Sequence, residues 1–277
     1  MKSAMSFETI RYETEGPLAW ITLDRPAKLN AISKGMVAEL NSAMDLALHD
    51  ERIRVILVKG EGRAFSAGFD LETDPDSALT PEQELKALKL ELNNDFDLIM
   101  RFWDSPKPTI AAVHGYCLGG ALELAIACDL TIAATACRFG EPEVKFGSGI
   151  VAMLLPYVCG PKRAREMLLT GNDRISSEQA ESWGLVNRVV AAEQLVEEAR
   201  SLAREIAGND QLAVRLTKQA INRCCENGPM REALKQALEL NMVIESTETE
   251  ESRAFNAILK TQGARAAIAW RDQQTLE

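Results

Sequence analysis

Residues 108–130, which read PTIAAVHGYCLGGALELAIACDL, contain the pattern from which we predict the fold. Residues 109–113 are a short apolar run that predicts a buried strand, and residues 121–127 follow a glycine-rich turn as a predicted helix. Residues 129–133 return as a second strand. Strand, helix and strand in this order predict an α/β layer built on β-α-β crossovers, whose ligands bind beyond the carboxyl ends of the strands.

The flanking segments extend this pattern. The runs LAWITL at 18–23 and IRVILV at 53–58 predict strands, and apolar residues recur between them at helical spacing behind Ser33 as N-cap. Residues 72–95 are charged, and we expect a mobile connection followed by a solvated helix there. Beyond residue 160 only residues 186–190 read as extended, and the predicted helices are 162–169, 176–183, 192–207, 211–226, 229–246 and 251–271. Such an amphipathic tail packs on the core or on another subunit.

Composition restricts the function classes. The 277 residues carry 31 Lys and Arg against 41 Asp and Glu, so no global positive field attracts nucleic acid. The six cysteines form no CxxC pair and are expected to be reduced core thiols, and two histidines exclude a three-histidine metal site. We find no signal-peptide pattern and no run of 18 apolar residues, and we expect a soluble cytoplasmic protein without membrane contact.

The glycine-rich turn is the first candidate for chemistry. If a helix starts near Gly119, Gly120 lies in its first turn, where backbone N–H groups have no intrahelical partner and suit an anion or a developing oxyanion. Glu123 projects from the same side of that turn, and the helix dipole favours its ionised form, which suits a base. Alternatively, Glu123 is an ordinary dipole partner and the glycines only pack the helix tightly on a sheet.

Two further segments are candidates. GRAFSAGFDL at 62–71 follows a strand and can present main-chain N–H groups to a ligand, or it is an ordinary turn with Asp70 as a helix N-cap. In RFGEPEVKFG at 138–147, Glu141 and Glu143 share one face if the segment is extended. Apolar neighbours can raise the pKa of a carboxyl that acts as an acid, whereas an exposed edge with a Glu and Lys pair is the alternative. The local sequence does not choose between the two glutamates.

Together the three segments predict a site that polarises a carbonyl while it moves protons, which is chemistry beside a thioester. In these residues the sequence resembles the crotonase, or enoyl-CoA hydratase/isomerase, family. The resemblance covers nearly the whole chain and includes, in order, WITLDRPAKLNAIS, GRAFSAGFDL, PTIAAVHGYCLGGALELAIACDL, FGEPEVKFG and TGNDRISSEQAESWGLVNRVV.

The resemblance implies a fold, a ligand and an assembly. The fold is a spiral of β-β-α turns with a helical C-terminal trimerisation region, so we expect a core at 1–200 and a region for packing and oligomerisation at 201–277. The ligand is an acyl-CoA thioester, and the assembly is a homotrimer or a dimer of trimers. No metal and no redox cofactor is implied, since coenzyme A is part of the substrate.

The resemblance also implies residue roles. Phe69 and Gly120 match the oxyanion hole, whose N–H groups hold the thioester oxygen. Glu123 matches the glutamate that orients and deprotonates water, and Glu143 matches the one that delivers a proton to the α-carbon, so that hydration of a 2-enoyl-CoA gives a 3-hydroxyacyl-CoA. Substrate or CoA contacts are expected at Arg25, Lys28, Ser66, Gly68, Asp70, Leu71 and Gly119, and weaker phosphate candidates are Lys260, Arg265 and Arg271.

One departure and several alternatives accompany this interpretation. Typical members follow the second glutamate with a turn resembling P-G-x-G-G beside the acyl pocket, whereas this chain has GSGIVAM at 147–153. An enoyl-CoA isomerase, a lyase or an acyl-CoA hydrolase is therefore the alternative within the family. A non-catalytic acyl-CoA-binding protein, an RNA-associated relative and a structural protein are less favoured, RNA because of the acidic charge.

Overall fold

The computed structural model describes residues 7–71, 80–226, 230–247 and 249–274, so residues 72–79 of the expected mobile connection lie outside the described residues. The described residues form a six-stranded sheet in the order β1-β2-β3-β4-β6-β9. All neighbours pair in parallel except β1 and β2. The strands are β1 (Ile10–Glu15), β2 (Leu18–Leu23), β3 (Val55–Gly60), β4 (Thr109–Val113), β6 (Leu130–Ala134) and β9 (Arg188–Val190).

A smaller sheet gives the fold its spiral form. Its described strands are β5 (Tyr116–Leu118), β7 (Arg138–Gly140) and β8 (Ile175–Ser176). β4 and β6 in the large sheet are each followed along the chain by β5 and β7 in the small one. The chain therefore alternates between the two sheets, which is how β-β-α turns stack into a spiral.

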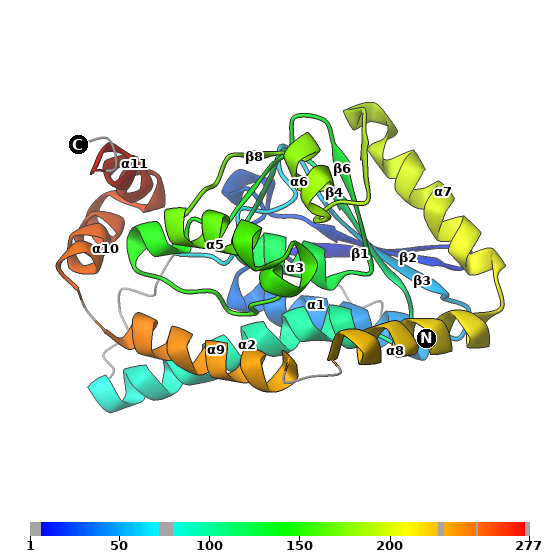
Figure 1. Cartoon of the computed structure of the whole chain (residues 1–277), viewed down its shortest axis with the longest axis horizontal. Helices are drawn as coiled ribbons and strands as arrows, with labels where there is room; N and C mark the ends of the chain where they lie inside the picture. Colours follow the sequence, from blue (N-terminus) through cyan, green and yellow to red (C-terminus); the bar gives the residue numbers. More distant parts are fainter. Residues whose placement is uncertain (1–6, 72–79, 227–229, 248, 275–277) are drawn as a thin grey trace.

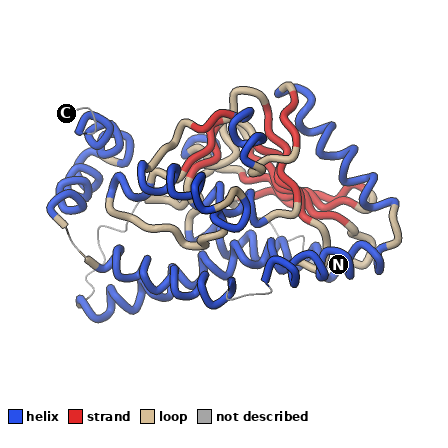
Figure 2. The backbone as a smooth tube through the Cα atoms, in the orientation of Figure 1, coloured by secondary structure: helices blue, strands red, loops and turns tan. Residues whose placement is uncertain are grey.

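Helices surround the strands, which gather in the interior (Figures 1 and 2). The α-helices of the described residues are α1 (Lys34–His49), α2 (Pro81–Asp104), α3 (Gly120–Ala127), α4 (Leu155–Val158), α5 (Pro161–Thr170), α6 (Ser177–Trp183), α7 (Leu195–Gly208), α8 (Gln211–Glu226), α9 (Met230–Ser246), α10 (Glu250–Gln262) and α11 (Ala264–Gln274). Short 3-10 helices are η1 (Pro26–Lys28), η2 (Glu143–Phe146) and η3 (Ala192–Gln194). None of the described helices is long and apolar enough to cross a membrane.

Both faces of the large sheet are buried. Alternate side chains such as Trp20 and Leu57 pack against α7, while their neighbours Ile21 and Val58 join the larger core that includes α1, α2 and α3. Parallel strands covered on both faces contain nearly continuous apolar runs. This burial explains why LAWITL at 18–23 lacks the alternation of a half-exposed strand.

Local signals set most helix ends. The Ser33 side chain accepts a hydrogen bond from the Met36 N–H and caps α1 as predicted, at 3.2 Å. The single helix expected at 251–271 is wrong, because Gly263 lies between α10 and α11 with a φ of +81°. A left-handed backbone ends a helix and is tolerated by glycine. The helix expected from residue 192 begins with η3 and becomes α-helical at Leu195.

The last two helices pack beside η2, at the end of the molecule away from α7 (Figure 1). The Phe255 ring of α10 stacks on the Phe146 ring of η2 with centroids 5.2 Å apart. Residue 200, the expected boundary between core and tail, lies inside α7. The division at this residue therefore stays a prediction.

Candidate active site

Glycines allow two side chains to approach the start of α3. Gly119 is the N-cap, with a φ of +54°, and a Cβ at this position would collide with the Glu143 carboxyl. A Cβ on Gly120 would collide with the Phe69 ring. The glycine pair thus brings the loop at 66–70, η2 and α3 into direct contact.

Two backbone N–H groups at this junction are without an acceptor. The Ile32 N–H donates to the Gly68 carbonyl at 2.8 Å and the Asp70 N–H donates to the Ile32 carbonyl at 3.0 Å, which leaves the Phe69 N–H between them. Gly120 begins α3, where the helix offers no acceptor. Within the described chain neither N–H donates a hydrogen bond. These two donors can polarise a carbonyl oxygen.

Glu123 lies one turn into α3 and is only 2% exposed. Its Oε1 accepts from the Val151 N–H at 3.0 Å and its Oε2 from the Ala152 N–H at 2.8 Å. Burial nevertheless raises the pKa of Glu123 to about 8, and these backbone hydrogen bonds oppose the shift. Burial thus favours the protonated form of Glu123, whereas the helix dipole was expected to favour the ionised form, and the role of this group as a base stays a prediction.

Glu143 begins η2, so the segment is not extended at this point and Glu141 and Glu143 do not alternate along a strand. Its Oε2 is buried without a hydrogen-bond partner among the described residues, and burial raises the pKa of Glu143 to about 7. A carboxyl with this pKa can hold a proton near neutral pH and release it.

Glu141 is fully buried, and neither of its oxygens meets an N–H or hydroxyl donor among the described residues. Burial raises its pKa well above the ordinary range, and repulsion from Glu143 and Glu123 adds to the shift. The Glu141 and Glu143 carboxyls also contact each other, which lowers the pKa of Glu143. Since a carboxylate has no proton to donate, a protonated Glu141 is the donor in this contact.

These groups surround one cavity of about 660 Å³. Its walls include Phe69, Gly120, Glu123 and Glu143, so the structure brings together the four residues for which catalytic or oxyanion roles were predicted. Asp70 and Leu71 of the 62–71 segment line it, as do side chains of α2, α9, α10 and α11. The cavity is mostly apolar with a few convergent polar groups, as small-molecule sites are.

The other predicted contact residues lie near the cavity but do not line it in the described chain. The Ser66 Oγ accepts from the Gly68 N–H at 3.2 Å and supports the loop. Arg25 forms an ion pair with Asp70 at 2.8 Å and donates to the Ala31 carbonyl, whereas Lys28 is exposed at the end of η1.

Of the three weaker candidates for phosphate contacts in the C-terminal tail, one lines the cavity and two do not. Arg271 lines the cavity, while Lys260 and Arg265 are exposed and are not part of the described lining.

The sequence interpretation missed four acidic lining residues, Glu91, Asp95, Asp173 and Glu245. Asp95 of α2 falls in the segment expected to be a solvated helix, yet it is buried; Glu245 of α9 was not considered. The spacing of Leu88, Leu92 and Asp95 placed them on one helix face, and this was the available signal. The N–H groups of Val151 and Ala152 had no sequence signal, because their approach to Glu123 is tertiary.

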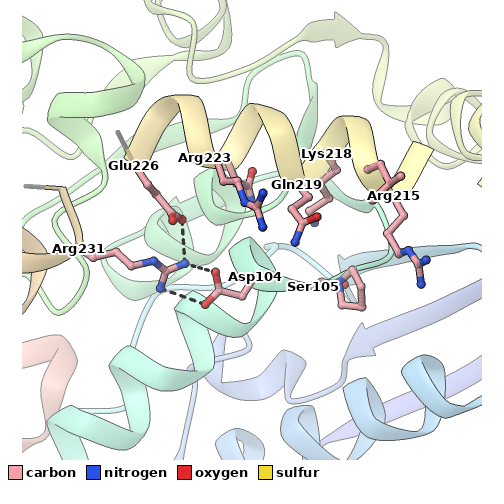
Figure 3. A pocket seen from close by; sticks show the side chains of 11 residues that line it. Asp104, Ser105, Arg215, Lys218, Gln219, Arg223, Glu226 and Arg231 are labelled. Carbon is pink, nitrogen blue, oxygen red and sulfur yellow. Dashed lines mark hydrogen bonds and ion pairs between the residues drawn. The ribbon is translucent and has the colours of Figure 1, made fainter. Parts of the chain in front are cut away.

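A second pocket of about 450 Å³ lies between the end of α2 and α8. Figure 3 shows Arg231 held between Asp104 and Glu226, and the Lys218 ammonium forms an ion pair with Asp129 at 2.7 Å. Each charged group named here forms an ion pair with a group of opposite charge, so these residues give no indication of a catalytic role. Among the described residues no group of three or more His, Cys, Asp or Glu side chains is arranged to hold a metal ion.

Comparisons with known proteins agree with this geometry. Residues 13–262 match the family model described as enoyl-CoA hydratase/isomerase. A probable mitochondrial enoyl-CoA hydratase of Dictyostelium discoideum is 39% identical over 79% of this chain and 77% of its own length. A crotonyl-CoA hydratase of Syntrophomonas wolfei is 37% identical over 79% of this chain and 83% of its own.

Solved structures agree as well. An enoyl-CoA hydratase/isomerase from Xanthobacter autotrophicus Py2 superposes with a TM-score of 0.91 and 46% identity, covering 97% of this chain and 99% of that one. The expected α/β fold class is thereby confirmed.

Proposed function

Because the chain belongs to the enoyl-CoA hydratase/isomerase family, we propose that it is an enoyl-CoA hydratase that adds water to a 2-enoyl-CoA and forms a 3-hydroxyacyl-CoA. The observation that carries the proposal is the meeting of two unpaired N–H groups and two desolvated carboxyls in one cavity. Relatives named enoyl-CoA hydratase support the same reaction.

The geometry suggests how the reaction proceeds. The Phe69 and Gly120 N–H groups hold the thioester oxygen and stabilise the enolate, a contribution worth about 3 kcal/mol for each donor. Glu123 takes a proton from water as it attacks the β-carbon, and Glu143 delivers a proton to the α-carbon. Backbone N–H groups of residues 151 and 152 fix the Glu123 carboxylate for this step.

We place the coenzyme A portion along the loops beside the cavity. Asp70 and Leu71 line the cavity, and the Arg25 ion pair with Asp70 holds that segment in place. The proposed contacts with the substrate or its CoA portion are Arg25, Lys28, Ser66, Gly68, Asp70, Leu71 and Gly119. No further cofactor is required by this reaction, since it involves no change of redox state.

We also propose a homotrimer or a dimer of trimers in the cytoplasm, with a core at 1–200 and a packing and oligomerisation region at 201–277. Large apolar side chains exposed on α8 and α9 support an interface there; they include Leu212, Leu216, Ile221, Leu240 and Val243. Exposed apolar patches of this kind mark interaction surfaces. The net charge of −10 argues against nucleic acid as a partner.

The test is turnover of 2-enoyl-CoA substrates. We expect the purified protein to consume the conjugated chromophore of crotonyl-CoA or of a longer 2-enoyl-CoA. Glu123→Gln and Glu143→Gln are each expected to lower kcat about 100-fold to 10,000-fold, and the exposed Glu166→Gln serves as the control. Absence of hydration at every chain length would contradict the proposal.

An enoyl-CoA isomerase is the second candidate, favoured by one observation. Both Glu123 oxygens already accept backbone hydrogen bonds, which leaves that carboxylate less capacity to orient water. A one-base isomerase that uses Glu143 should tolerate Glu123→Gln while losing activity in Glu143→Gln. The same two variants, assayed with a 3-enoyl-CoA, distinguish the reactions.

A further inference from the structure

One face of α2 forms a wall of the active-site cavity. Leu88, Glu91, Leu92 and Asp95 all line it and recur every three or four residues, so they share one side of the helix. Leu92 is buried in one cluster with Val151, which also lines the cavity, and Leu88 packs against this cluster. The two leucines of this wall suit the hydrocarbon part of an acyl chain, whereas Glu91 and Asp95 are acidic.

Asp95 is the more buried of the two acidic residues on this wall. It is 8% exposed, and no residue that the structure describes donates a hydrogen bond to its carboxyl. Burial raises the pKa of Asp95 to about 7, repulsion from Glu91 adds to the shift, and Lys34 opposes it. Lys34 is itself paired with Glu91 at 3.0 Å. Placing a largely desolvated carboxyl on the wall of a cavity costs free energy and calls for an explanation.

The position of Asp95 supplies that explanation. Asp95 and Glu123 line the same cavity, and the Asp95 charge adds to the raised pKa of Glu123, so an acyl chain bound beside Glu123 shares this cavity with Asp95. A plain alkyl chain would leave this carboxyl desolvated and unpaired. A substrate that hydrogen-bonds to it removes that cost.

Resting on the proposed function, we propose that Asp95 determines specificity by hydrogen-bonding a hydroxyl group carried by the acyl chain beyond the double bond of the 2-enoyl-CoA. A hydroxyl both donates and accepts, so it suits the carboxyl in either protonation state. The substrate class is thus a hydroxylated 2-enoyl-CoA rather than a simple aliphatic one.

The experiment compares kcat/KM for 2-hexenoyl-CoA with its 4-, 5- and 6-hydroxy derivatives. The wild type is expected to prefer at least one hydroxylated substrate about tenfold or more. Asp95→Leu should reverse that preference, and Asp95→Asn should retain part of it. Asp97→Asn, on the exposed side of the same helix, is the matched control, and this variant should keep the wild-type substrate preference and crotonyl-CoA turnover within threefold.

Two results would overturn the proposal. One is a wild type whose kcat/KM for 2-hexenoyl-CoA is at least as high as for every hydroxylated derivative. The other is an Asp95→Leu variant in which kcat/KM falls by the same factor for all substrates. Thermal unfolding checks that each variant folds, and both Asp95 variants are expected to unfold at a higher temperature than the wild type. If Asp95→Leu does not fold, Asp95→Asn carries the test.

A binding measurement separates this inference from the proposed reaction. Calorimetric titration with saturated hexanoyl-CoA and its hydroxylated analogues requires no turnover. A hydroxyl preference that disappears in Asp95→Leu, without hydration of any 2-enoyl-CoA, would retain the role of Asp95 and reject the hydratase. Hydration of 2-enoyl-CoA without a preference for hydroxylated compounds, in turnover or in binding, would support the hydratase and reject the role of Asp95.

Discussion

The two pockets of the molecule both contain charged residues, but they use them differently. In the pocket of about 450 Å³ between α2 and α8, Arg231 and Lys218 each form ion pairs with carboxylates. In the cavity of about 660 Å³, burial raises the pKa of Glu123 and of Glu143, and neither carboxyl forms an ion pair with a residue that the structure describes. Charge alone therefore does not identify a reactive site; desolvation without an opposite charge does.

Among the changes that test this difference between the two pockets, Gly120→Ala is expected to have the largest effect on kcat. The added Cβ would collide with the Phe69 ring and displace one of the two N–H donors proposed for the oxyanion hole of the larger cavity. We expect kcat to fall about 100-fold, as for loss of one oxyanion donor. Gly208→Ala is the control, because no atom lies within 4 Å of the new Cβ; an equal fall in both variants would argue against the oxyanion role.

The pH dependence of kcat/KM should reveal the desolvated carboxyls. With pKa values of about 8 for Glu123 and about 7 for Glu143, the pair carries one proton mainly between pH 7 and 8. Hydration needs an ionised Glu123 and a protonated Glu143, which is the less populated form of the one-proton state because Glu123 has the higher pKa. The value of kcat/KM follows the total one-proton population, so it should peak there and fall about tenfold per pH unit on either side. A profile that stays flat from pH 5 to 9 would contradict the assigned roles.

Glu141→Gln should change stability in a pH-dependent way. The pKa of Glu141 is higher in the folded state than in the unfolded state, so the native state binds this proton more tightly. The contribution of the bound proton to the stability of the native state is fully present below about pH 4.5 and is lost as pH rises. The Gln side chain does not titrate in this range. The free energy of unfolding of Glu141→Gln should therefore rise relative to that of the wild type by at most about 1.4 kcal/mol per pH unit from pH 5 to 9. Thermal unfolding at several pH values measures it, with Glu166→Gln expected to show no such trend.

The smallest effect on activity is expected from Lys218→Met in the smaller pocket. The change removes the ion pair with Asp129 and the hydrogen bond to the Lys107 carbonyl, and should lower the free energy of unfolding by about 1–3 kcal/mol. Turnover of enoyl-CoA should stay within twofold. A large loss of kcat in a stably folded variant would mean that this pocket also takes part in the reaction.

Local sequence predicted the elements whose determinants are themselves local. The strands at 18–23 and 109–113 and the start of α3 follow from apolar runs and a glycine turn. Asp95 was assigned to a solvated helix because its charged neighbours dominate the sequence window, whereas only tertiary packing buries it. The raised pKa of Glu123 likewise depends on walls contributed by distant segments.

The positions of the cavity residues along the chain bear on how the protein matures. Leu29 lies at one end of this set and Arg271, in the last described helix, at the other. During synthesis the sheet can form while the tail is still inside the ribosome, because domains generally fold from the N-terminal side. The cavity lining is complete only after residue 271 emerges, so a nascent chain that lacks α11 still lacks one wall of the site.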